Sequence, residues 1–134
     1  MATVTFAHVA LTCNDPIKIE EFYCRYFGFK RTRVFNPGPE QFVMIKLGEI
    51  YLELFKAEKE SPESAPFETG HVYPGWRHIA FSVKNLDSKL AELGDNAKIT
   101  HGPLDLSEFI PGWRVCWIAD PEGNIIELSQ GYID

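Results

Sequence analysis

The sequence is poor in cysteine, and the few cysteines present do not form a recognisable pattern. Cys13, Cys24 and Cys116 are odd in number and widely spaced, and no two of them form a CxxC pair. A disulfide framework uses an even set of cysteines, and thiolate zinc sites use closely spaced pairs. The cysteine content therefore argues against both, and favours a protein of the reducing cytosol.

Long hydrophobic runs and an excess of positive charge are also missing. No apolar stretch approaches the roughly 20 residues that a membrane-spanning helix needs. Residues 1–6 lack the basic start and apolar core of a signal peptide. The net charge is −6, and no long basic run interrupts the chain. We therefore expect a cytoplasmic protein with neither a membrane nor a nucleic acid as partner.

What the chain does have is the composition of a globular domain. It has 134 residues, of which 45% are hydrophobic and 13% aromatic. A chain of this length can bury a substantial core, and its apolar content is well above that of disordered chains. We expect a single domain over residues 1–134.

The first part of the chain, about residues 4–56, predicts a βαβββ module. Asp15 and Pro16 form a helix start, and Gly28 follows an apolar stripe with helical spacing. Runs rich in alternating apolar residues, separated by glycine and proline, predict the strands. The expected elements are strand 4–12, helix 16–27 and strands 29–35, 42–47 and 50–55.

The second part, about residues 76–132, repeats this order after a polar linker at residues 57–75. Asn85 and Gly94 delimit a short helix with a leucine stripe. The expected strands are 77–83, 98–101, 113–119 and 124–129, with an irregular stretch at 102–112. Two βαβββ modules, each with a helix covering the apolar face of its sheet, predict an α+β fold.

The repetition extends to individual residues. His8-Val-Ala-Leu-Thr-Cys recurs as His78-Ile-Ala-Phe-Ser-Val, and each module ends in a strand with Glu-Leu, at Glu53 and at Glu127. Because side chains alternate along a strand, these four residues are expected on the face opposite the helices. The apolar residues between them are expected in the core: Val9, Leu11, Leu52, Leu54, Ile79, Phe81, Ile126 and Leu128.

Two imidazoles and two carboxylates at matched positions favour a divalent metal ion, namely Zn, Ni, Co, Mn or Fe(II). A six-coordinate ion would keep two positions for water or for two substrate oxygens, and it would act as a Lewis acid. Taken singly, each residue has an ordinary alternative. A histidine in a strand is commonly a packed or surface residue, and Glu53 and Glu127 can be charges that protect edge strands from aggregation.

These features resemble the vicinal oxygen chelate superfamily, which contains glyoxalases, bleomycin-resistance proteins and extradiol dioxygenases. The resemblance rests on the paired His-x-Ala strands, the duplicated βαβββ order and the motif Asp-Pro-Glu-Gly-Asn-x-x-Glu-Leu at residues 120–128. It implies tandem modules that form a curved, cleft-like mixed sheet, and a homodimer. It also implies that His8, Glu53, His78 and Glu127 are metal ligands, a set similar to that of bacterial glyoxalase I.

The resemblance also implies an activity. A metal-dependent lyase or isomerase would chelate two oxygens of a small hydroxy-carbonyl or thioester substrate, with Glu127 moving the proton and Glu53 completing the site. Thr12 and Ala57 stand where glyoxalase I enzymes of this size usually have Arg and Asn, so a glutathione adduct is disfavoured as substrate. Two alternatives remain open. One is an Fe(II) dioxygenase that uses His8, His78 and Glu127, and the other is a non-catalytic, resistance-type binding protein.

Other residues carry weaker expectations. His71 falls in the predicted linker and His101 at the end of strand 98–101, next to the irregular stretch, and both are expected to face solvent. Trp76 and Trp113 are expected either to line the pocket or to pack in the core, and Cys116 is expected to be buried and unreactive.

Overall fold

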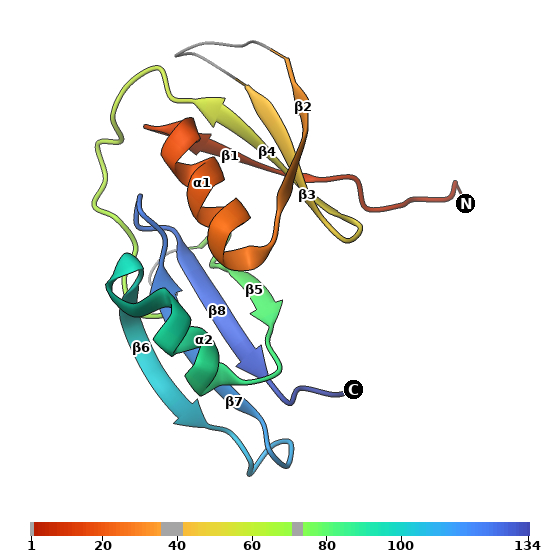
Figure 1. Cartoon of the computed structure of the whole chain (residues 1–134), viewed down its shortest axis with the longest axis vertical. Helices are drawn as coiled ribbons and strands as arrows, with labels where there is room; N and C mark the ends of the chain where they lie inside the picture. The colour runs from red at the N-terminus through yellow and green to blue at the C-terminus, as the bar shows by residue number, and fades with distance from the viewer. Residues whose placement is uncertain (1, 36–41, 71–73) are drawn as a thin grey trace. The chain divides into compact units, whose positions relative to one another are not determined.

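The elements follow one another in two βαβββ series (Figure 1). The computed structural model describes residues 2–35, 42–70 and 74–134, which divide into the compact units Met1–Pro62 and Glu63–Asp134. The first unit contains β1 (Val9–Cys13), α1 (Pro16–Phe27), β2 (Lys30–Val34), β3 (Val43–Leu47) and β4 (Ile50–Lys56). The second contains β5 (Ile79–Ser82), α2 (Leu86–Leu93), the 3₁₀ helix η1 (Gly94–Asn96), β6 (Lys98–Asp105), β7 (Arg114–Ala119) and β8 (Ile125–Gln130).

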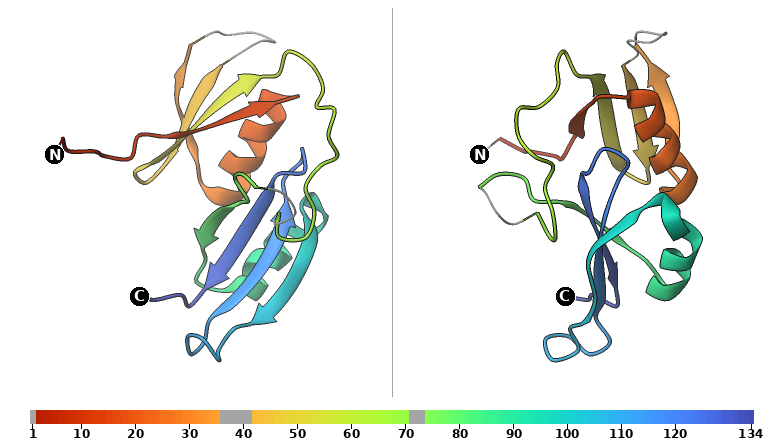
Figure 2. Two further views of the ribbon diagram at one scale, coloured as in Figure 1. Left: turned by 180° about the vertical axis from the view of Figure 1, so that it is seen from behind. Right: turned by 90° about the vertical axis from the view of Figure 1, so that its left-hand side faces the viewer.

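The two units have the same topology. The strand orders are β1-β4-β3-β2 and β5-β8-β7-β6, so the first strand of each unit pairs with the last. These outer pairs are parallel, and the remaining pairs are antiparallel. In each unit the helix lies along one face of its own sheet (Figure 2). The α+β fold with two βαβββ modules is therefore confirmed.

Both helices begin where the sequence predicts. The Asp15 carboxylate accepts a hydrogen bond from the Lys18 backbone N–H at 3.1 Å, and the Asn85 side chain accepts one from Ser88 N–H at 2.9 Å. α1 ends at Gly28, whose φ of +77° is the left-handed conformation that glycine adopts without strain. The helices bury apolar side chains that include Ile19, Phe22, Tyr23, Tyr26, Leu86 and Leu93.

The alternation predicted for the strands is observed in the central strands. In β4, Leu52 and Leu54 are buried while Glu53 is partly exposed, and in β8 Ile126 and Leu128 are fully buried on either side of Glu127. The two glutamates therefore lie on the face opposite the buried leucines. This face holds the candidate site.

The prediction for the first strand is partly wrong. Strand 4–12 was expected, but β1 begins only at Val9, and Val9 was expected in the core although it is 41% exposed. β1 is an edge strand of its unit, paired with β4 alone. Apart from Cys13 at the end of β1, the buried strand residues of this unit lie in the inner strands β3 and β4. An edge strand has no second neighbour to exclude water.

The stretch 102–112 is more regular than expected. β6 continues to Asp105, and Leu104 pairs with Val115 of β7 after shifts in register on either side of His101. Leu104 packs against a cluster of Val115, Trp117 and Ile125, and this packing stabilises a strand through the Gly102-Pro103 pair that the sequence marks as a break.

Neither α1 nor α2, nor any other helix in the part of the chain that the structure describes, has the length and apolar content of a membrane-spanning helix.

Candidate functional site

The first unit brings His8 and Glu53 together. His8 lies one residue before β1, and Glu53 lies in β4 with Ala10 as its register partner across the parallel pair. His8 Nε2 and Glu53 Oε1 are 3.4 Å apart. The His8 side chain is 40% exposed and that of Glu53 is 17% exposed, so the pair lies at the surface of its unit but is not fully hydrated.

The second unit repeats this arrangement with His78 and Glu127. Ala80 is the register partner of Glu127 across the parallel β5–β8 pair, and His78 Nε2 is 3.6 Å from Glu127 Oε1. Both side chains are 18% exposed. The predicted duplication is thus present in register, in the ring nitrogen used and in the spacing of the two side chains.

The turn at residues 120–124, which precedes Glu127, has a structural role that its hydrogen bonds define. The Asp120 carboxylate accepts hydrogen bonds from the backbone N–H groups of Glu122 and Asn124 at 2.8 and 3.0 Å, and from the Asn124 side-chain amide at 2.8 Å. An aspartate that satisfies several donors in this way fixes a tight turn. It thereby sets the start of β8 and the direction of Glu127 three residues further on.

The spacing within each pair suits two ligands of one metal ion. The contacts of 3.4 and 3.6 Å are longer than an ordinary N–H···O hydrogen bond. Two ligand atoms, each about 2.0–2.2 Å from one ion, are roughly 3.4 Å apart around a tetrahedral ion and roughly 3.0 Å apart at adjacent positions of a six-coordinate ion, so each pair closes by a few tenths of an ångström to bind the latter. Imidazole and carboxylate are both common ligands of divalent first-row metals. The donor set and its spacing therefore fit a metal ion.

Each unit by itself contains two of the four candidate ligands. Within residues 2–35, 42–70 and 74–134, the structure shows no group of three or more His, Cys, Asp or Glu side chains arranged to hold a metal. That His8, Glu53, His78 and Glu127 hold the same ion stays a prediction.

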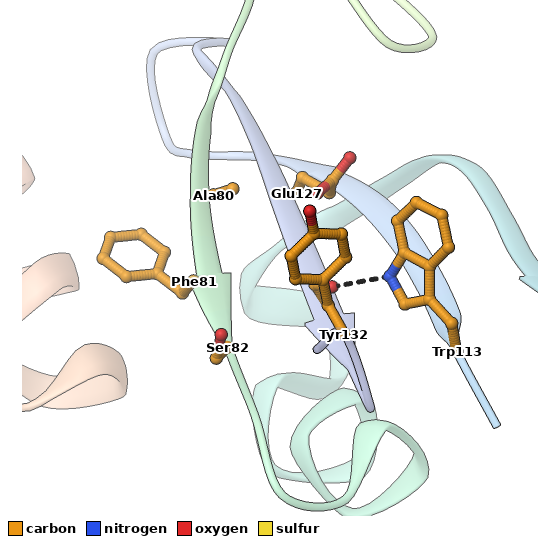
Figure 3. A pocket seen from close by; sticks show the side chains of 7 residues that line it. Ala80, Phe81, Ser82, Trp113, Glu127 and Tyr132 are labelled. Carbon is orange, nitrogen blue, oxygen red and sulfur yellow. Dashed lines mark hydrogen bonds between the residues drawn. The ribbon is translucent and has the colours of Figure 1, made fainter. Parts of the chain in front are cut away.

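An open pocket of about 240 Å³ adjoins Glu127 in the second unit (Figure 3). The Trp113 indole N–H donates a hydrogen bond to Ser129 Oγ at 2.9 Å, and its ring meets Tyr132 edge-on with centroids 5.4 Å apart. In Figure 3 the Tyr132 ring lies between β5 and Trp113, with its hydroxyl directed to the side of the pocket where Glu127 lies. The lining residues are Ala80, Phe81, Ser82, Trp113, Glu127, Ser129 and Tyr132.

The surroundings of His78 include Arg77 and one residue that the sequence does not reveal, Thr69. His78 Nδ1 is 3.3 Å from the backbone oxygen of Thr69, and Arg77 contacts Thr69 through both its backbone oxygen and its hydroxyl. Thr69 falls in the predicted linker and has no residue pattern that marks it. Only the folded chain places it against the imidazole.

Trp117 is another residue that sequence reasoning overlooked. It is the register partner of Glu127 across β7–β8, and its ring lies 6.4 Å from that of His78. Its indole N–H is buried and has no hydrogen-bond partner within the described part of the chain. A buried donor without an acceptor costs free energy. In this protein that cost falls on a residue next to the candidate ligands His78 and Glu127.

The remaining expectations have mixed outcomes. Trp113 lines the pocket as predicted, but Trp76 is fully exposed and does not pack in a core. His101 is exposed as predicted, although its ring contacts Trp117, and His71 lies outside the described residues. Cys116 is buried, as predicted.

Comparison with known proteins agrees with this geometry. The sequence profile of the Glyoxalase/Bleomycin resistance protein/Dioxygenase superfamily matches residues 5–128. The chain therefore belongs to this superfamily, and the resemblance noted from its motifs is confirmed.

Individual relatives cover nearly the whole chain. The chain is 28% identical over 126 residues to YwkD of Bacillus subtilis (strain 168), described as an uncharacterized protein, with 92% of this chain and 94% of the relative aligned. The crystal structure of a glyoxalase family protein from Enterococcus faecalis matches with a TM-score of 0.68 and 28% identity, over 94% of this chain and 97% of that one. The fosfomycin resistance protein FosX from Mesorhizobium loti shares the fold, with a TM-score of 0.64 and 16% identity over 98% and 95% of the two chains.

Proposed function

We propose that the protein is a metal-dependent lyase or isomerase that acts on a small hydroxy-carbonyl or thioester substrate. One divalent ion would be held by His8, Glu53, His78 and Glu127. When bound, the ion would supply Lewis-acid chemistry to two neighbouring substrate oxygens. Membership of the superfamily supports this proposal at the level of the family, and the residues of this chain support the details.

The observation that carries the proposal is the equivalence of the two His–Glu pairs. Each pair uses histidine Nε2 and glutamate Oε1, and each glutamate lies opposite an alanine two residues after the histidine. An isolated surface pair can arise from simple charge attraction and contributes little to stability. Two pairs with the same geometry at equivalent places of a duplicated unit favour a shared chemical role.

Glu127 is the residue we assign to proton transfer. Its carboxylate lines the pocket, within reach of a molecule bound there, and it lies on the well-ordered strand β8. A carboxylate at this place can accept a proton from the carbon beside a carbonyl and return it to a neighbouring atom. Glu53, partly buried in the same manner, completes the ligand set and favours four ligands over the three that a dioxygenase of this fold needs.

The pocket in the second unit indicates the part of the substrate that does not bind the metal. Its walls include the Trp113 and Tyr132 rings, and Glu127 is the single ionisable acid among the seven lining residues, none of which is Lys or Arg. A carboxylate or phosphate would find no cation there, and it would be repelled by Glu127. An uncharged, preferably flat substituent is favoured, which agrees with the absence of a glutathione-binding Arg at Thr12.

Metal binding is the first test. Purified protein is treated with a chelator and titrated with Zn, Ni, Co, Mn and Fe(II) by isothermal titration calorimetry, in parallel with elemental analysis. We expect one ion per chain, and a large loss of affinity when any one of the four ligands is replaced by Ala. His101→Ala is the matched control, because His101 is an exposed histidine outside the proposed set. Two ions per chain, each lost with one pair only, would contradict a shared site.

Turnover is the second test. Hydroxy-ketones, 2-oxoaldehydes and thioesters are supplied without oxygen, and catechols with oxygen. We expect anaerobic turnover that falls by about 10²–10⁴-fold in Glu127→Gln, the range that general acid–base catalysis contributes. Oxygen uptake with catechols and stoichiometric iron would instead identify a dioxygenase. Ligand binding that survives the chelator without turnover would identify a binding protein.

We also propose that the protein is a homodimer. Short chains of this superfamily commonly pair, and the site would then be built from the first unit of one chain and the second unit of another. The polar linker between the units permits this arrangement as well as a site within one chain.

A further inference from the structure

We propose that the backbone at residues 67–70 acts, together with Arg77, as a clip that holds the His78 ring in the tautomer with its proton on Nδ1. We call this segment the 67–70 clip. Its use in metal binding rests on the proposed function, but the tautomer itself is a property of the metal-free chain. Thr69 and Arg77 are positioning residues, because they act through His78.

The contact to the ring favours one position of the proton. His78 Nδ1 lies 3.3 Å from the Thr69 carbonyl oxygen. A carbonyl oxygen can only accept, so a hydrogen bond here requires the N–H on Nδ1. In the neutral ring Nε2 then directs its lone pair toward Glu127 at 3.6 Å, the arrangement that a shared metal ion needs. Without the ion the Glu127 carboxylate favours a proton on Nε2, so the clip has to outweigh that attraction. Free histidine in water favours the opposite tautomer, with the proton on Nε2, which cannot bind a metal through that atom.

Arg77 fixes the carbonyl that makes this contact. Arg77 Nε donates to the Thr69 backbone oxygen at 3.0 Å, and Nη2 donates to the Thr69 hydroxyl at 2.5 Å. Thr69 is 8% exposed, so both of its oxygens are held largely away from solvent. A bidentate guanidinium contact of this kind constrains position as well as distance. Arg77, which holds the Thr69 carbonyl in place, therefore directly precedes His78, whose ring that carbonyl orients.

The backbone of the clip is strained, and other groups hold it in place. Glu68 has φ of +52°, a left-handed conformation that is costly for a residue with a side chain. Its carbonyl accepts a hydrogen bond from the Thr100 hydroxyl at 2.5 Å, and Gly70 N–H donates to the Phe67 carbonyl at 2.9 Å. A Cβ at Gly70 would lie 2.4 Å from the Arg77 backbone oxygen, so only glycine allows this close approach.

The equivalent histidine of the first unit lacks such a clip. Among the described residues, the His8 ring contacts the Glu53 carboxylate and no backbone carbonyl. The His8 side chain is 40% exposed. His8 is therefore a built-in reference for a ring that faces a carboxylate through Nε2 in the same way but lacks the clip. Outer hydrogen bonds to a ligand histidine typically change metal affinity or activity by about 10–100-fold.

The test measures tautomers directly, in the full-length, chelator-treated protein. Long-range ¹H–¹⁵N correlation spectra, recorded at a pH where the histidines are neutral, distinguish a protonated from an unprotonated ring nitrogen. We expect His78 to be protonated on Nδ1 and His8 to be a mixture that favours Nε2. A wild-type His78 protonated on Nε2 would overturn the proposal without any variant.

Arg77→Gln then tests the clamp. We expect the His78 tautomer to shift toward Nε2 while His8 and His101 stay unchanged. Arg114→Gln is the matched control, since Arg114 also makes a bidentate contact, to Asp87 at 3.1 Å through both nitrogens, but does not touch Thr69. An unchanged His78 tautomer in Arg77→Gln would overturn the role of Arg77. Should Arg77→Gln fail to fold, Thr100→Val serves as the second variant, with a smaller shift in the same direction expected and no shift contradicting the clip.

Metal titration of the same variants separates the two proposals. We expect Arg77→Gln to bind the metal about 10–100-fold more weakly than wild type and Arg114→Gln to bind it normally. If the wild-type tautomer is as expected and shifts in Arg77→Gln, but no metal binds to wild type, the clip stands and the metal-dependent function fails. If metal binds with equal affinity to wild type and Arg77→Gln, the clip has no part in metal binding.

Discussion

At the scale of single residues, the thiols differ in burial and therefore in reactivity. Cys116 is fully buried, and this burial raises its thiol pKa to about 11, against the small opposing effect of the Arg114 charge. Burial, followed by the negative charge of Glu20, also raises the pKa of Cys24. Since the thiolate is the reactive form, a raised pKa lowers reactivity at pH 8.

We predict that a disulfide reagent at pH 8 modifies native Cys116 far more slowly than a free thiol. Cys24, which is only partly buried, should react first, and the rate at Cys116 should rise as the pH approaches its pKa. Mass spectrometry of peptides after timed labelling measures both rates, with denatured protein as the fully reactive reference. Rapid labelling of Cys116 in the folded protein at pH 8 would show that the β7 environment opens readily.

A second residue-scale prediction concerns the buried indole N–H of Trp117. Leaving a buried donor without a partner costs about 1–3 kcal/mol, so Trp117→Phe recovers part of what it loses in packing. We predict that this variant loses less stability than Leu128→Ala, for which a fully buried leucine loses about 2–5 kcal/mol. Chemical denaturation of the metal-free proteins provides the comparison. A loss in Trp117→Phe as large as in Leu128→Ala would mean that the N–H has an acceptor.

At the scale of elements, one ion pair connects α1 to β2. Glu20 is buried and accepts two hydrogen bonds from Arg31, from Nε at 2.7 Å and from Nη2 at 2.6 Å. We predict that Glu20→Gln lowers the free energy of unfolding by about 1–3 kcal/mol, a range below that of a fully buried pair because the Arg31 side chain is 47% exposed. Urea denaturation of both proteins measures the difference.

The pair between α2 and β7 is the matched control. Asp87 and Arg114 form the same bidentate contact at the surface, and Asp87→Asn is expected to change stability much less than Glu20→Gln. The hydrogen bond from Arg114, and then its charge, lowers the pKa of Asp87, so any stabilisation is present above the unfolded carboxyl pKa and is lost as the pH falls through the folded pKa. Equal losses of unfolding free energy in the two variants would show that the burial of Glu20 does not strengthen its ion pair with Arg31.

How far the sequence predicts these elements depends on how local their causes are. The helix caps at Asp15 and Asn85 arise from neighbouring residues, and each is predicted within its segment. The late start of β1 and the extension of β6 to Asp105 depend on partner strands and packing, which a pattern of residues does not contain.

The candidate site shows the same division. The four ligand candidates are marked by a repeat, because duplication preserves residue type and spacing together. Thr69, Arg77 and Trp117 occur once and follow no motif. The contacts that Thr69 and Trp117 make with the His78 ring form only when their segments fold against it.

At the scale of the whole molecule, the proposed four-ligand site combines a first unit with a second unit, of one chain or of two chains. We predict that His8→Ala and His78→Ala, each inactive alone, regain activity when mixed if the site combines units of two chains. A mixed dimer would then contain one intact and one doubly defective site, so random exchange would restore about a quarter of the sites. Metal binding and turnover after mixing and re-equilibration measure this fraction.

The controls for this mixing experiment use the chain itself. Mixing Glu53→Ala with His8→Ala should restore nothing, because both residues belong to the first unit. Sedimentation establishes whether the protein is a dimer. A dimer that exchanges subunits but shows no recovery with the His8→Ala and His78→Ala pair would place each site within one chain.

The pairing of β1 with β4, and of β5 with β8, has a consequence for synthesis on the ribosome. The strand that emerges first in each unit finds its partner only when the last strand has emerged, so the sheet cannot close gradually as the chain grows. A nascent chain halted before Ile50 would hold β1 without its hydrogen-bonding neighbour, and one halted before Ile125 would leave β5 in the same condition. Each unit must leave the ribosomal tunnel entire before its imidazole and carboxylate can meet.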